Sequence, residues 1–266
     1  MNSENDIIVS PYSLASYYVE MFFNDIKLSN ATCFFTKRRE KRYLITNWHV
    51  VSGKDADTLQ CLDKNASIPN KLYVYLPAKT DDGKAIFNDD FIVVDLYDTE
   101  DKPIWYEMKK NNQMIDIAVI PLNDEMDKYI LDIEDAEEPF NETVNINIAD
   151  EIYIIGFPFG RIGGVLPIWK KASVASEPSL DLNDMPYYFA DTATKPGMSG
   201  SPVVLYEKRP ITLTESLHGK FSRHRTKIVG IYSGRIGANT ENKNDAQLGR
   251  VWKVKMLDEI IGKFEA

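Results

Sequence analysis

The amino-acid sequence predicts an all-β fold, with one helix at each end of about eleven short strands. Short runs of apolar and β-branched residues fill the middle of the chain, separated by asparagine, aspartate, glycine and proline, which is typical of antiparallel strands. Apolar residues recur at helical spacing near both termini. The 266 residues are 44% hydrophobic and 27% charged, which is ordinary for a globular protein with a sizeable core.

The first element is a helix expected over residues 11–24. Ser10 and Pro11 have the form of an N-cap followed by proline at the first helical position. The apolar residues that follow have the spacing of one helix face: Leu14, Ala15, Tyr18, Met21 and Phe22.

About eleven strands follow, and a second helix closes the chain. The strand-like runs are ATCFFT, RYLITN, KLYVYL, FIVVDLY, DIAVIPL, EIYIIGF, LPIWKKASV, YYFA, SPVVLY, KIVGIYSG and GRVWKV. Helical spacing returns over residues 254–264. We expect a single domain over residues 1–266, because no repeat or Gly/Ser linker divides it. If there are two halves, the acidic stretch 132–143 is the best candidate connection, although a solvated loop would have the same sequence.

Charge and cysteine content limit the kinds of partner and compartment. The formal net charge is −9, which argues against nucleic acid as a partner. The sequence has no run of eighteen apolar residues and no secretory signal pattern, so no membrane contact is expected. Cys33 and Cys61 form no CxxC motif. A cytoplasmic location with free thiols is therefore the expectation.

Three residues stand in settings that suit chemistry. His49 follows a β-rich run in YLITNWHVV, Asp116 opens the apolar strand MIDIAVIPL, and Ser199 lies between glycines in TKPGMSGSPVV. Each has an ordinary alternative: a hydrogen-bonded structural histidine, an aspartate at the exposed end of a strand, and a serine in a tight turn. Found together in the order His, Asp, Ser, they are much less expected by chance.

The glycines beside Ser199 favour a catalytic interpretation. Gly197 and Gly200 allow backbone angles that bring two amides into one small space. Such amides can stabilise the negative oxygen that develops during acyl transfer. A serine hydroxyl also needs a base, and a histidine oriented by a carboxylate can serve.

These blocks resemble the trypsin-like serine peptidases of the chymotrypsin fold, especially the bacterial HtrA-like branch. The resemblance lies in TNWHVV, DIAVIPL and DTATKPGMSGSPVV, and extends to IIGFPFG and IVGIYSG, so it spans residues 32–253. It implies two six-stranded antiparallel β-barrels, at about 28–131 and 144–253, with the site between them. Terminal helices are expected at about 11–24 and 254–264.

The resemblance also implies a role for each site residue. Ser199 would attack the scissile carbonyl, His49 would carry its proton to the leaving amine, and Asp116 would orient His49. The amides of Gly197 and Ser199 would form the oxyanion hole. The substrate would be a protein or peptide, and no cofactor is implied.

The resemblance further implies where the substrate side chain before the cut would bind. The expected pocket residues are Ala193, Thr194, Tyr232, Ser233 and Gly234, and the wall extends to Arg235. No acidic residue is evident at its base, which argues against a preference for lysine or arginine. A small or medium apolar side chain is the expectation.

The sequence also departs from the family pattern. Met198 replaces the aspartate that pairs with a new N-terminus in activated digestive proteases, so activation by cleavage is not indicated. The glycines usual before the second strand are replaced by SNATCFF, and no cysteine follows His49 to staple its loop.

Other sites and functions have weaker support. His218 and His224 lack accompanying cysteines or an acidic pair, so no metal site is predicted. An α/β-hydrolase is disfavoured because its order is Ser, acid, His. The basic segment 207–227 is interpreted as a solvated hairpin loop, or as a surface that selects acidic substrates or partners.

The competing function is a binding protein that keeps the protease fold but no longer turns over substrate. A third alternative is latent activity that a protein partner switches on. The intact trio counts against the silent binding protein, because folding alone does not require it.

Overall fold

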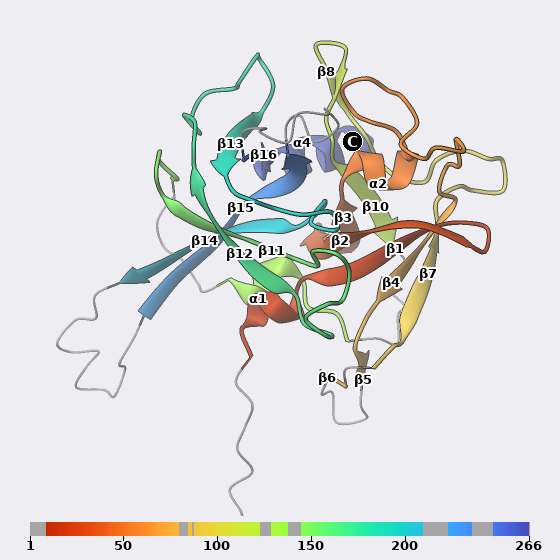
Figure 1. The fold of residues 1–266 in the computed structure, drawn as a ribbon, viewed down its shortest axis with the longest axis horizontal. Helices are drawn as coiled ribbons and strands as arrows, with labels where there is room; N and C mark the ends of the chain where they lie inside the picture. The colour runs from red at the N-terminus through yellow and green to blue at the C-terminus, as the bar shows by residue number, and fades with distance from the viewer. Residues whose placement is uncertain are drawn as a thin grey trace, which may run out of the picture.

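The protein consists of two antiparallel β units packed side by side. The computed structural model describes residues 9–79, 85–86, 88–122, 129–137, 145–209, 223–235 and 247–265. Figure 1 shows the first unit on the right, the second on the left, and the C-terminal helix between them at the top. The predicted all-β class with two six-stranded units is therefore confirmed.

The first unit is a curled six-stranded sheet with the order β10-β3-β2-β1-β4-β7. Among the described residues its end strands β7 and β10 are not paired with each other, so it remains open. Its strands are β1 (Tyr17–Phe23), β2 (Ile26–Arg38), β3 (Lys41–Thr46), β4 (Lys71–Tyr75), β7 (Phe91–Asp95) and β10 (Ala118–Leu122). The short pairs β5 (Ala78–Lys79) with β6 (Ala85–Ile86), and β8 (Lys109–Lys110) with β9 (Gln113–Met114), form separate hairpins.

The second unit is a closed barrel with the order β11-β12-β13-β16-β15-β14. Its strands are β11 (Glu151–Gly156), β12 (Ile168–Val174), β13 (Tyr187–Asp191), β14 (Pro202–Arg209), β15 (Arg223–Arg235) and β16 (Leu248–Lys253). The helical elements are α1 (Pro11–Leu14), α2 (Trp48–Ser52), the 3-10 helix η1 (Ile133–Ala136) and α4 (Lys255–Phe264). No described helix is both long and apolar enough to cross a membrane.

The helix predicted over residues 11–24 is wrong for most of its length. Only α1 is helical, and β1 then begins at Tyr17 and pairs with β2 and β4. Tyr17, Val19 and Met21 alternate into the interior of the first unit, so pairing on both sides outweighs the apparent helical spacing. The first unit therefore begins at β1 rather than near residue 28. The helix predicted at the C-terminus is present as α4.

Buried apolar residues form three clusters that hold the two units together. One fills the first unit and another fills the second barrel. The third lies between the units and includes Phe34, Ile117, Ile155, Ile231 and residues of α4. Because the units share this core, side chains from both can be held in fixed positions at their boundary.

Two further sequence expectations fall in the loops. The acidic stretch 132–143 begins with Asp132 and η1, where the buried Asp132 carboxylate accepts two 2.9 Å bonds from Arg42. Part of this stretch is therefore a packed connection rather than a solvated loop, and residues 138–143 lie outside the described residues. Cys33 and Cys61 are free thiols, as predicted.

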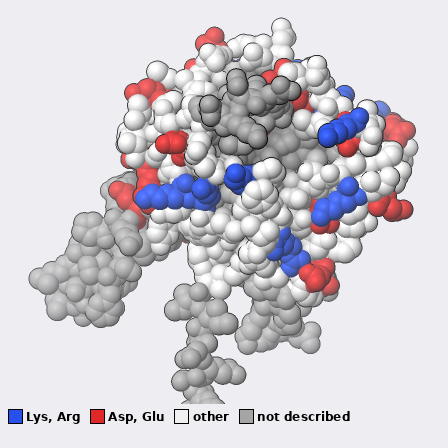
Figure 2. Space-filling model, in the orientation of Figure 1, with Lys and Arg blue, Asp and Glu red and all other residues white. Residues whose placement is uncertain are grey.

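The basic segment 207–227 is described only at its flanks. Those flanks pair as the ends of β14 and β15, with Glu207 opposite Arg225, as a hairpin requires. Residues 210–222, including His218, lie outside the described part of the chain. On the face drawn in Figure 2, basic and acidic side chains are interspersed among the described residues.

Candidate active site

His49 and Asp116 are joined directly. His49 is the second residue of α2, which follows β3, and Asp116 precedes β10, the strand paired with β3. The Nδ1 atom of His49 lies 2.8 Å from Oδ2 of Asp116, and the His49 backbone N–H donates to Oδ1 at 2.8 Å. The side-chain amide of Asn47 donates to the Asp116 carbonyl oxygen at 2.8 Å. These bonds fix the imidazole ring against the carboxylate.

The Asp116 carboxylate is buried and accepts a further hydrogen bond. Its side chain is 4% exposed, against 18% for His49. The hydroxyl of Ser233, from the second barrel, donates to Oδ2. The pairing of β15 with β16 shifts register between Tyr232 and Gly234, and this irregularity turns Ser233 toward the first unit. Asp116 is therefore held by groups from both units.

The two ionisable groups shift each other's pKa in opposite directions. Burial lowers the pKa of His49, but the charge of Asp116 and its hydrogen bond outweigh burial and leave that pKa above its usual value. Burial raises the pKa of Asp116, but His49 and the hydroxyl of Ser233 outweigh it and leave that pKa below its usual value. A neutral His49 facing an ionised Asp116 suits a base that gains a proton during a reaction.

Ser199 lies on the turn that leads from β13 into β14, and this turn packs on the first unit. The Thr32 amide of β2 donates to the Ser199 carbonyl oxygen at 2.8 Å. At Gly200, with φ of +80°, a Cβ would lie 2.1 Å from the Thr32 carbonyl oxygen and 2.4 Å from Oγ1 of Thr46. Only glycine fits there, and Thr46 is three residues before His49. The structure therefore brings Ser199 beside the segment that carries His49.

The link from Ser199 to the other two residues runs through β15. The Gly200 amide donates to the Tyr232 carbonyl oxygen at 2.9 Å, and the next residue, Ser233, bonds Asp116. Within the described residues, no hydrogen bond joins the hydroxyl of Ser199 to His49. Ser199, His49 and Asp116 thus share one region at the boundary of the units, with the His49–Asp116 bond already formed.

The amides expected to form an oxyanion hole donate no hydrogen bond to another described residue. Among the hydrogen bonds of the described residues, neither the Gly197 nor the Ser199 amide acts as a donor. Gly197 has φ of +98°, and a Cβ there would lie 2.2 Å from the Phe157 carbonyl oxygen. Only glycine fits this turn, and within the described part of the chain its amide and that of Ser199 have no acceptor.

The expected pocket residues separate into two groups. Thr194 and Tyr232 are buried, and their hydroxyls hydrogen-bond each other. Ala193 and Gly234 are partly exposed. Ser233 uses its hydroxyl on Asp116, a contact that sequence reasoning missed when it assigned this residue to the pocket wall. The register shift between Tyr232 and Gly234 directs this side chain, and no local sequence pattern indicates that shift.

Thr32 was also missed. Its Oγ1 donates to the Gly197 carbonyl oxygen at 2.9 Å and accepts from the Phe157 amide at 3.1 Å, while its own amide holds Ser199. A threonine at alternating spacing in a strand carries no sequence signal for such a role. One buried residue therefore ties the turn that carries Ser199 to the neighbouring loop.

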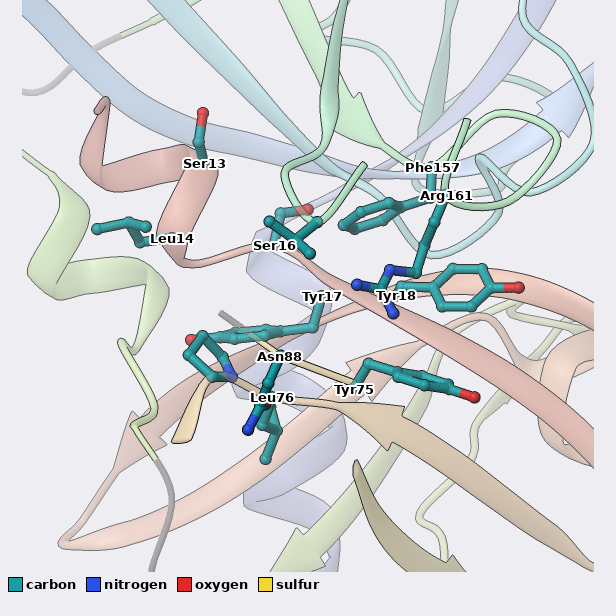
Figure 3. A pocket seen from close by; sticks show the side chains of 12 residues that line it. Ser13, Leu14, Ser16, Tyr17, Tyr18, Tyr75, Leu76, Asn88, Phe157 and Arg161 are labelled. Carbon is teal, nitrogen blue, oxygen red and sulfur yellow. The ribbon is translucent and has the colours of Figure 1, made fainter. Parts of the chain in front are cut away.

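A shallow groove is lined by Phe157 and Arg161, which belong to that loop, and by residues of the first unit. Figure 3 shows Arg161 and Phe157 of the second barrel facing Tyr18 and Tyr75 of the first unit. The Arg161 guanidinium lies 5.3 Å from the ring centre of Tyr75, and the Tyr18 and Phe157 rings are 5.6 Å apart. The groove is lined by both units, next to the loop that contacts Gly197.

No metal centre is evident among the residues that the structure describes, where no three His, Cys, Asp or Glu side chains gather as ligands would. His218 is outside those residues, and only the backbone of His224 is described, in β15.

Comparison with known proteins gives one family and a set of similar folds. The profile of the trypsin-like peptidase domain matches residues 31–212. A serine endoprotease from Yersinia pestis is 13% identical, with 97% of this chain and 67% of that chain covered at a TM-score of 0.50. The inactive form of the Mycobacterium tuberculosis protease Rv3671c is 14% identical, with 96% and 91% covered at a TM-score of 0.46. No curated protein sequence matches the chain.

Proposed function

The chain belongs to the trypsin-like peptidase family, and from this we propose that it is a serine endopeptidase that cleaves protein or peptide substrates through an acyl-enzyme. The catalytic residues of the proposal are His49, Asp116 and Ser199. The observation that carries it is the buried Asp116 carboxylate, bonded to Nδ1 of His49 and to its backbone N–H at 2.8 Å each. This arrangement keeps the proton on Nδ1 and leaves Nε2 as the acceptor.

The proposed reaction has two halves. In the first, Oγ of Ser199 attacks the scissile carbonyl carbon while Nε2 of His49 takes the hydroxyl proton. The C–N bond then breaks, and His49 gives this proton to the leaving amine. In the second half, water attacks the acyl-enzyme with His49 again as the base, which releases the acid and restores Ser199. Asp116 stabilises the imidazolium in both halves, consistent with the raised pKa of His49.

The amides of Gly197 and Ser199 are the proposed oxyanion hole. In the proposed complex they donate to the negative oxygen of the tetrahedral intermediate, and the finding that neither donates to a described protein acceptor supports this role. Removing one such donor typically costs an enzyme about 10²–10³ in kcat. The positive φ of Gly197 is needed to present its amide.

The substrate backbone has a proposed place along β15. The pairing of β14 with β15 ends at Pro202 opposite Ile231, so no strand among the described residues lies beside the β14-facing edge of residues 233–235. That edge continues directly from Tyr232, whose carbonyl oxygen accepts a hydrogen bond from the Gly200 amide. An extended peptide can add to such an edge through backbone hydrogen bonds, which brings its carbonyl to Ser199 without demanding a particular sequence.

Cleavage of an unfolded protein tests the proposal. Wild-type protein should cut reduced, unfolded casein into fragments, and Ser199→Ala should not, while both give the same thermal melting temperature. A folded wild-type protein that cuts no more than Ser199→Ala would contradict the proposal. Cleavage that appears only after addition of a cell extract, and still requires Ser199, would instead identify the partner-activated alternative.

A further inference from the structure

The interior of the second barrel ends directly beneath the turn that carries Ser199. Met198, the residue before Ser199, is 1% exposed and belongs to the apolar cluster that fills this barrel. Tyr232 belongs to the same cluster, and its carbonyl accepts from the Gly200 amide. The mouth of the barrel is therefore next to the proposed nucleophile, where the substrate side chain before the cut is expected to bind.

The ring of Tyr232 occupies this mouth. On the neighbouring strand β16, a Cβ at Gly249 would lie 2.4 Å from Cε2 of Tyr232 and 3.0 Å from its hydroxyl oxygen. The absence of a side chain at Gly249 is thus what makes room for the ring. Tyr232 is 1% exposed, so its ring fills the space rather than bordering an open cavity.

Thr194 fixes the ring from the opposite wall. Its side chain is on the segment between β13 and Ser199, and its hydroxyl is hydrogen-bonded to the hydroxyl of Tyr232. Thr194 is 3% exposed, so this bond is shielded from water. To move the ring, a ligand would have to break a buried hydrogen bond and leave polar atoms without partners, which is costly.

Further along β15 there is open space at Gly234. A Cβ at Gly234, two residues after Tyr232, would meet no atom within 4 Å. A substrate side chain could therefore approach beside Gly234, but the buried Tyr232 and Thr194 leave it little depth.

We propose that Tyr232 and Thr194 close the floor of the pocket for the substrate side chain before the scissile bond, so that the protein cleaves after glycine, alanine or serine. This inference rests on the proposed peptidase function. A longer side chain would meet the Tyr232 ring, and a branched or aromatic one would need the ring to leave the mouth of the barrel. A single methylene group already changes kcat/KM by about 10-fold to 200-fold in a close-fitting pocket.

A peptide series that varies only the residue before the cut tests the inference. We expect kcat/KM to be highest for glycine, alanine and serine, and to fall at least about 100-fold for leucine, phenylalanine and arginine. A wild-type preference for leucine, phenylalanine or arginine would overturn the inference. Titration of active sites with a small alkyl fluorophosphonate, which needs no side-chain pocket, separates this result from failure of the peptidase function. No labelling would reject both, whereas labelling with a wrong preference would reject only the pocket.

Variants of Tyr232 give a second test. Tyr232→Val should open the pocket and raise kcat/KM for leucine and phenylalanine at least about 10-fold relative to alanine. Tyr232→Phe is the matched control, because it keeps the ring and should keep the preference for small residues. A folded Tyr232→Val with the wild-type profile would overturn the inference.

Peptidyl phosphonate inhibitors cover the case in which Tyr232→Val does not fold. With wild-type protein, an inhibitor carrying alanine at the position before the reactive phosphorus should inactivate at least about 100-fold faster than its phenylalanine analogue. Equal rates would contradict the closed floor.

Discussion

Replacing Asp116 with asparagine removes a charge and almost no volume, and its effect can be worked out from the contacts. The carboxylate accepts from the His49 backbone N–H at Oδ1 and faces Nδ1 of His49 and the hydroxyl of Ser233 at Oδ2. If the side-chain oxygen of the asparagine keeps accepting the hydrogen bond from the His49 backbone N–H, the side-chain NH₂ group of the asparagine faces Nδ1. His49 then carries its proton on Nε2 and can no longer accept one from Ser199.

The opposite orientation of the asparagine is also unfavourable. It would place the NH₂ group against the His49 backbone N–H, and the loss of a buried hydrogen bond costs about 1–3 kcal/mol. We therefore expect the wrong imidazole tautomer to dominate in Asp116→Asn. A loss of about 10⁴ in rate, or about 5 kcal/mol of transition-state stabilisation, is the size known for this change in a Ser-His-Asp enzyme.

The pH dependence of activity provides an independent test of the role of Asp116. The reaction needs neutral His49, so activity rises as pH increases through the pKa of His49. In the wild type, Asp116 holds this pKa above its usual value against the effect of burial. In Asp116→Asn, burial lowers the pKa of His49 without the opposing charge. The pH at which activity rises should therefore be lower than in the wild type, and the maximal activity reached above that pH should also be lower.

The assay is the second-order rate of fluorophosphonate labelling between pH 5 and pH 9, corrected for the folded fraction. Asp132→Asn is the matched control, because Asp132 is also buried but is paired with Arg42 outside the site. It should lower stability and leave the rate per folded molecule unchanged. A folded Asp116→Asn that labels within about tenfold of wild type, with an unshifted pH dependence, would refute the role of Asp116.

Three further predictions follow from the same contacts. Gly200→Ala should lower the free energy of unfolding by about 3 kcal/mol in urea titrations, because φ is +80° and the new Cβ would lie 2.1 Å from a carbonyl oxygen of β2. Gly262→Ala in α4, where a Cβ meets nothing within 4 Å, should not destabilise, and equal effects of the two changes would contradict the account. Ser233→Ala removes a hydrogen bond to the buried carboxylate and should slow labelling about tenfold; a rate equal to wild type would show that this bond is not needed. In a thiol-reagent assay, native protein should expose Cys61 and not Cys33, whose burial raises its thiol pKa, so rapid reaction of both would be the wrong result.

The sequence singles out candidate site residues more readily than the contacts that surround them. His49, Asp116 and Ser199 could be singled out because each lies in a short block whose residue types suit one chemistry. Gly197 and Gly200 were informative because positive φ and close backbone contacts exclude other residues. These signals are local, so they can be recognised without knowledge of the packing.

The wrong predictions concern residues whose secondary structure or side-chain direction is determined by tertiary contacts. Residues 17–23 fit both helical spacing and strand alternation, and only their pairing with β2 and β4 selects the strand. The bond from Ser233 to Asp116 depends on a register shift between β15 and β16, which no local pattern announces. The position of the Tyr232 ring depends on Gly249, a residue of the neighbouring strand that leaves room for it.

The central claim is that Ser199 is made nucleophilic by His49 within one site. Mass spectrometry after fluorophosphonate treatment tests it most directly, by locating the adduct and following its rate of formation. The account predicts a single adduct on Ser199, a rate that rises with pH as His49 loses its proton, and no adduct in folded His49→Ala. An adduct on another residue, or equal labelling of Ser199 in His49→Ala, would contradict it.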